Sequence, residues 1–146
     1  MLDDRINSFD RYCMRAFGAF NKNRLGTGRT LTEVAVLNEI AMHPGVNANK
    51  VATFLGIDSG YMTRLVKSMD ADGLIVRTNS DDDHRVKCMT LTEKGRRMNA
   101  DDAAEARMRN GALLDGLSAD EVEEVLASMK RIEMLLAPNV PIEIED

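Results

Sequence analysis

The sequence has few cysteines and no long apolar run. Cys13 and Cys88 lie far apart and neither belongs to a CxxC pair, so neither a disulfide framework nor a cysteine-rich zinc site is predicted. The longest apolar runs are a handful of residues, far short of the ~20 that a membrane-spanning helix needs. The first residues, MLDDRINSFD, are polar and acidic, without the pattern of a signal peptide. These absences predict a cytoplasmic protein with no membrane partner.

Residue combinations typical of catalysis or of metal binding are also missing. No Ser/His/Asp or Cys/His pattern accompanies a recognisable motif, and no glycine-rich loop is placed to cradle a phosphate. The two histidines, His43 and His84, are too few and too far apart for a zinc site unless Cys13 and carboxylates join them. We therefore expect no enzyme activity, no cofactor and no metal.

Charge is distributed unevenly along the chain. The 146 residues carry a net charge of −5 and are enough to bury one hydrophobic core with helical extensions. Residues 1–57 and 58–97 have net charges of +2 and +1, whereas residues 98–146 carry four basic and twelve acidic side chains. A surface that binds an anion is therefore expected in the first two thirds of the sequence.

Apolar spacing predicts a mainly α-helical (α+β) fold. Apolar residues repeat every three to four positions in residues 2–20 and again in 122–136, as in amphipathic helices. Between these stripes, capping residues and glycines predict further helices at about 30–43, 47–55 and 59–72, and a long helix after Thr92. The segments LIVRT and RVKCMTL, joined by the polar NSDDDH, predict a β-hairpin with a long tip.

The segment VATFLGIDSGYMTRLVKSM is typical of a helix-turn-helix. Ala52 is a small residue for the helix contact, Gly56 suits the turn, and Met62 and Leu65 face inward. Helical geometry predicts that the outward face carries Ser59, Gly60, Tyr61, Thr63, Arg64, Lys67 and Ser68. This outward face suits the DNA major groove, where arginine pairs with guanine and hydroxyls or lysine contact phosphate. The alternative is an ordinary solvated helix face.

A hairpin directly after a helix-turn-helix predicts a winged helix. Arg85 and Lys87 would then face phosphate, with His84 beside them. Asp83 would hold the Arg85 guanidinium through charge-assisted hydrogen bonds, and an arginine ordered in advance loses less rotamer entropy on binding. The alternative is a solvated hairpin tip with no binding role.

Five motifs follow one another without interruption between about Leu31 and Met98. They are LTEVAVLNEI, VATFLG, SGYMTRLVKSMDADGLIVR, Asp83-x-Arg85 and LTEKG. In this order they resemble the MarR family of bacterial winged-helix regulators, and the last two motifs, at their separation from the second helix, are the most specific part. The wing tip lacks the proline often seen in the family, and His84 replaces a permanent cation found in many members.

The resemblance implies a homodimer of winged helix-turn-helix subunits that binds an inverted repeat in double-stranded DNA. Residues 1–29 and 99–146 would supply dimerisation helices, residues 30–98 would be the DNA-binding domain, and the acidic C-terminal third would face away from the DNA. Family members usually release DNA when a small, often phenolic or anionic, ligand binds, or when a cysteine is oxidised. We therefore expect a transcriptional regulator, and a repressor in particular.

Two questions stay open on the sequence. Cys13 lies where peroxide-sensing relatives have a reactive cysteine, but the simpler interpretation is one more apolar residue in a buried stripe. The fold could also serve as a protein-interaction module, or as a ligand or redox sensor, without direct DNA binding.

Overall fold

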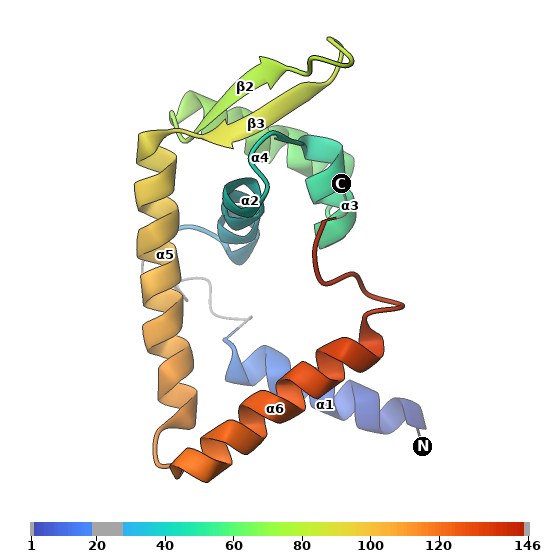
Figure 1. Cartoon of the computed structure of the whole chain (residues 1–146), viewed down its shortest axis with the longest axis vertical. Helices are drawn as coiled ribbons and strands as arrows, with labels where there is room; N and C mark the ends of the chain where they lie inside the picture. The colour runs from blue at the N-terminus through green and yellow to red at the C-terminus, as the bar shows by residue number, and fades with distance from the viewer. Residues whose placement is uncertain (1, 19–27, 145–146) are drawn as a thin grey trace.

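The computed structural model describes residues 2–18 and 28–144, with side chains from residue 4 onward. Three helices and a small sheet form one end of the molecule, helices α1 and α6 form the other, and the long helix α5 runs between the two ends (Figure 1). The elements are α1 (Leu2–Ala16), α2 (Leu31–Met42), β1 (Val46–Asn47), α3 (Ala48–Leu55), α4 (Ser59–Ala71), β2 (Ile75–Asn79), β3 (Lys87–Leu91), α5 (Glu93–Gly111), the short 3-10 helix η1 (Ala112–Leu114) and α6 (Ala119–Leu136).

Helices α3 and α4 form the predicted helix-turn-helix around an apolar core. Gly56 ends α3 with φ 65°, a left-handed conformation that glycine adopts without strain. Asp58 then caps α4 by accepting a hydrogen bond of 2.9 Å from the backbone N–H of Tyr61. The buried core is Val36, Leu37, Ile40, Val46, Val51, Ala52, Met62, Leu65, Val66, Met69, Leu74, Ile75, Met89 and Leu91.

The sheet has three antiparallel strands in the order β1-β3-β2. Strands β2 and β3 form the predicted hairpin, with Ile75 opposite Leu91 and Asn79 opposite Lys87. Strand β1 adds to the free edge of β3 and was not predicted, because two residues are too few to produce an alternating pattern. The winged-helix fold predicted from the sequence is therefore confirmed, with one additional short strand.

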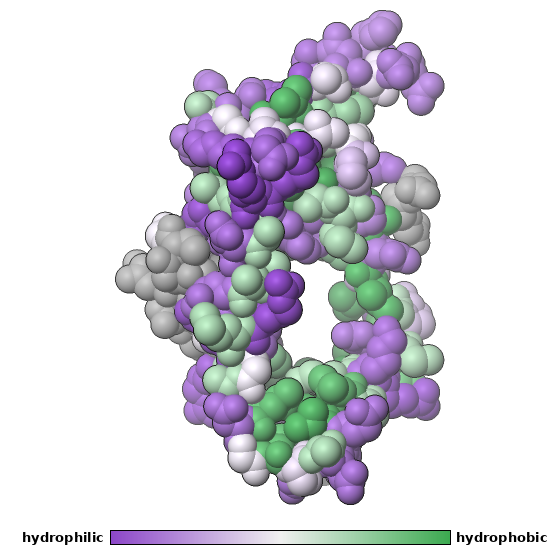
Figure 2. Space-filling view, turned by 60° about the vertical axis from the view of Figure 1, so that its left-hand side comes forward, coloured by the Kyte–Doolittle hydropathy of each residue, from purple (hydrophilic) through white to green (hydrophobic). Residues whose placement is uncertain are grey.

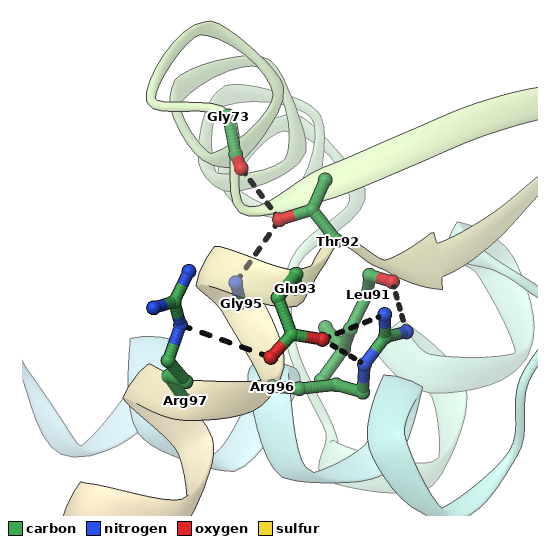
Figure 3. Close-up of polar contacts among 7 residues, drawn as sticks. All are labelled: Gly73, Leu91, Thr92, Glu93, Gly95, Arg96 and Arg97. Atoms are coloured by element: carbon green, nitrogen blue, oxygen red, sulfur yellow. Dashed lines mark hydrogen bonds and ion pairs between the residues drawn. The ribbon is translucent and has the colours of Figure 1, made fainter.

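Thr92 joins the sheet, the end of α4 and the start of α5 (Figure 3). Its hydroxyl donates to the carbonyl oxygen of Gly73 at 2.6 Å and accepts from the backbone N–H of Gly95 at 3.0 Å, so that it caps α5. Arg96 donates to the carbonyl oxygen of Leu91 at 3.0 Å and pairs with Glu93. These contacts fix the position of α5 relative to the winged helix.

Helices α1 and α6 leave many apolar side chains exposed. Helix α6 has no buried residue, and Phe9 in α1 and Leu135 in α6 are 53% and 58% exposed. Figure 2 shows apolar surface gathered at this end of the molecule. Helix α1 is shorter than the predicted stripe, and Phe20 at the end of that stripe lies outside the described residues.

Candidate nucleic-acid interface

Most of the side chains predicted for the outward face of α4 are exposed. These residues are Ser59, Gly60, Thr63, Arg64, Lys67 and Ser68. Tyr61 differs from the prediction, because its ring is half-buried and packs against the core. The Thr63 hydroxyl donates to the carbonyl oxygen of Ser59 at 2.8 Å, so it has an internal partner in this state. Arginine, lysine and serine thus provide the outward donors of α4.

Arg64 lies over the first turn of α4. Its guanidinium carbon is 5.7 Å from the centroid of the Tyr61 ring, within the range of a cation–π interaction. A Cβ at Gly60 would be in ordinary contact with an Arg64 nitrogen, at 3.8 Å, but would crowd a carboxylate oxygen of the N-cap Asp58, at 3.1 Å. The Arg64 guanidinium therefore packs over the half-buried ring of Tyr61, which lies three residues earlier on the same helix.

The wing tip, residues 80–86, holds Arg85 through Asp83. One carboxylate oxygen of Asp83 accepts hydrogen bonds from the Arg85 backbone N–H at 3.0 Å and from its side-chain Nε at 3.2 Å. The Arg85 side chain is nevertheless 92% exposed, so its terminal nitrogens remain available to an external anion. This is the contact that the sequence predicts between the two residues.

The other charged groups of the hairpin also have defined places. Lys87 donates to the side-chain oxygen of Asn79 across the hairpin, and His84 is exposed in the tip. Arg77 on β2 lies 4.0 Å from Asp70 on α4, which links the hairpin to the outward helix. The cations of α4 and of the hairpin therefore lie at the same end of the molecule, opposite α6 (Figure 1).

Outside this surface, the described part of the chain offers little to hold a metal. Residues 2–18 and 28–144 contain no group of three or more His, Cys, Asp or Glu side chains in ligand geometry. Cys13 and Cys88 are free thiols and both are half-buried. Among the same residues, none of the helices combines the length and the apolar character that crossing a bilayer requires.

The acidic C-terminal third departs partly from its predicted position. Helix α6 lies at the end opposite the hairpin, as expected, but the post-α6 segment (residues 138–144) returns to the side of α3 (Figure 1). Ile144 there packs against the core of the winged helix. Sequence inspection missed this contact because a short stretch after a helix, PIEI, carries no periodicity that indicates a partner.

Comparison with known proteins agrees with this geometry. Residues 27–86 match the model of the MarR family. The winged-helix part of the chain is thus similar to the MarR family. A transcriptional regulator of this family from Rhodococcus sp. RHA1 is 29% identical, with a TM-score of 0.71 over 90% of this chain and 94% of that one.

Two further solved structures relate the chain to CouR. The transcriptional repressor CouR bound to a 23-mer DNA duplex is 28% identical, with a TM-score of 0.70 over 86% of this chain and 89% of that one. CouR from Rhodococcus jostii RHA1 bound to p-coumaroyl-CoA is 29% identical, with a TM-score of 0.74 over 99% of both chains. The similarity to these MarR-type structures thus extends through the flanking helices.

Proposed function

We propose that this chain is a transcriptional regulator that binds double-stranded DNA with α4 in the major groove and the hairpin beside it. The proposal rests on one observation. Arg64 and Lys67 on the exposed face of α4, and Arg85 on the wing, paired with Asp83, lie at the same end of the molecule. Arg64 would read a base edge, while Lys67, Lys87 and Arg85 would contact phosphate. The solved complex of CouR with DNA supports this class of partner.

We also propose that the binding form is a homodimer. The exposed apolar faces of α1 and α6, which include Phe9, Leu126, Ile132 and Leu135, would be covered by the same faces of a second copy. A two-fold axis would then present two α4 helices about 34 Å apart, the spacing of successive major grooves. The target would accordingly be an inverted repeat.

We propose that the protein represses transcription and that a small ligand or an oxidant relieves this repression. The structure of CouR with p-coumaroyl-CoA supports a ligand as the signal in a protein of the same fold. Cys13 on α1 is the candidate for oxidation, and Cys13→Ser should abolish a peroxide response if that route operates. If peroxide releases Cys13→Ser from DNA as it releases the parent, Cys13 is not the sensor, and a small ligand becomes the proposed signal.

The proposal is tested by measuring binding to duplexes from the region upstream of the chain's own gene. Arg64→Ala should weaken binding by about 1–3 kcal/mol and relax sequence preference, because a base contact is lost. Lys67→Ala should weaken binding to all sequences alike and reduce the salt slope by about one. Lys130→Ala on α6, exposed and distant from α4, is the matched control and should bind as the parent does.

A winged helix that binds only other proteins, or a sensor that makes no direct contact with DNA, would behave differently. Arg64→Ala, Lys67→Ala and the parent would then bind every duplex equally weakly, with no inverted repeat preferred. That outcome would remove the DNA-binding proposal.

A further inference from the structure

A groove lies between α3, the wing and the post-α6 segment. Its volume is about 680 Å³. Lys50 and Phe54 line it from α3, Arg85 and Lys87 from the hairpin, and Glu143 and Ile144 from the post-α6 segment. The groove therefore brings three cations of the winged helix together with a carboxylate that follows the dimerisation helices in sequence.

The post-α6 segment contacts the core of the winged helix through Ile144. Ile144 is half-buried and packs against the core of the winged helix, whereas Ile142, two residues earlier, is 54% exposed. The chain bends at Ile142 and Glu143, so the two isoleucines do not share one face: Ile144 faces the protein, and Ile142 faces solvent.

Charge favours the same placement. The sequence after α6 carries only acidic ionisable side chains, Glu143 followed by Glu145 and Asp146. Opposite charges that line one groove attract each other, and the attraction extends over a Debye length of about 8 Å at physiological salt. Arg85 and Lys87 are the wing cations assigned above to DNA phosphate, and a phosphate would compete with the Glu143 carboxylate for them.

We propose that the post-α6 segment is an internal competitor of DNA. Ile144 docks it in the groove, and Glu143 then offsets the positive potential of the wing. This inference rests on the proposed function, since it assigns a regulator to the same DNA-binding surface. A segment docked for about nine tenths of the time would weaken the apparent DNA affinity about tenfold, because only the undocked fraction is competent.

Two matched substitutions separate docking from charge. Ile144→Asp removes the apolar anchor, whereas Ile142→Asp adds the same carboxylate at an exposed position of the same segment. Added negative charge alone would weaken DNA binding in both variants. We expect Ile144→Asp instead to bind duplex about three- to tenfold more tightly than the parent, and Ile142→Asp to bind equally or slightly more weakly, by fluorescence anisotropy at fixed salt.

Backbone amide NMR spectra without DNA provide the second measurement. Ile144→Asp should shift the resonances of Lys50 and Lys87, and Ile142→Asp should leave them in place. Absence of these shifts, or equal DNA affinity of Ile144→Asp and the parent, overturns the competitor inference while DNA binding itself stands. If neither the parent nor Ile144→Asp binds any duplex, both the competitor role and the proposed function fail.

Discussion

Arg29 and Asp102 form an ion pair that joins the residue before the N-cap of α2 to the middle of α5. Asp102 is 1% exposed and Arg29 18% exposed. The second oxygen of Asp102 and the Nε of Arg29 make no hydrogen bond within the described residues. Two remote parts of the chain are thus connected through one buried contact between charged groups.

Removing one member of this pair should destabilise the fold strongly. Asp102→Ala is expected to lower the free energy of unfolding by about 3–5 kcal/mol, because the arginine is left without its counter-charge. Replacing both residues, Arg29→Met with Asp102→Leu, should recover much of that loss. Urea unfolding measures both changes, and the exposed neighbour Asp101→Ala should stay within about 0.5 kcal/mol of the parent. An equal loss in the double variant would contradict this account.

Gly95 in the first turn of α5 should tolerate no side chain. A Cβ there would lie 2.0 Å from the carbonyl oxygen of Leu74, so Gly95→Ala must displace α5 from the sheet and should cost about 1–3 kcal/mol or more. Gly111 at the end of the same helix has open space around its Cα. Gly111→Ala should therefore stabilise the protein by about 0.4–1 kcal/mol, and thermal unfolding of the two variants should move in opposite directions.

Asp83 should act on DNA affinity through Arg85. Asp83→Ala frees the arginine side chain, and the loss of an exposed pair of about 0.2–1 kcal/mol corresponds to about a 1.4- to fivefold weaker complex. Arg85→Ala should weaken binding more, because the phosphate contact itself is lost. Asp81→Ala, at the same tip and exposed, removes one negative charge and should leave affinity unchanged or higher. Weaker binding by Asp81→Ala than by Asp83→Ala would exclude the positioning role.

The apolar face of α6 should be needed for association. Ile132→Glu places a carboxylate on that face and should shift the protein from dimer to monomer in sedimentation experiments, because the charge cannot be buried without a partner. Ala127→Glu introduces the same charge on the opposite side of the helix and should leave the dimer intact. A dimer that survives Ile132→Glu would rule out this interface.

The capping box at the start of α6 predicts a specific pH effect. The Ser118 backbone N–H and then its hydroxyl hold the pKa of Glu121 below its ordinary value. A lowered folded-state pKa contributes stability above the unfolded pKa, and that contribution disappears as pH falls through the folded value. Ser118→Ala should raise the Glu121 pKa only partway, since the backbone donor remains. NMR titration of the Glu121 carboxyl checks this, with Ser128→Ala as the control.

The local parts of the fold could be predicted because their causes lie within a few residues. Thr30 and Ser118 each form the capping box that their spacing indicates, and Asp58, Gly56 and the apolar face of α4 define the helix-turn-helix. The Asp83 contact with Arg85 spans two residues and was also within reach of sequence inspection. Periodicity, capping and turn chemistry act over one or two helical turns, so these features could be predicted from the sequence alone.

Contacts between distant segments were decided only by the tertiary structure. Nothing near Arg29 indicates Asp102, nothing near Gly95 indicates the carbonyl of Leu74, and nothing after α6 indicates that Ile144 meets the winged helix. Tyr61 is half-buried for the same reason, because the packing of α4 against the core, and not its helical position, set its exposure. The sequence by itself therefore determined which elements form and which charges they carry. Their arrangement depends on long-range packing and on pairing of buried charge, for which no local pattern exists.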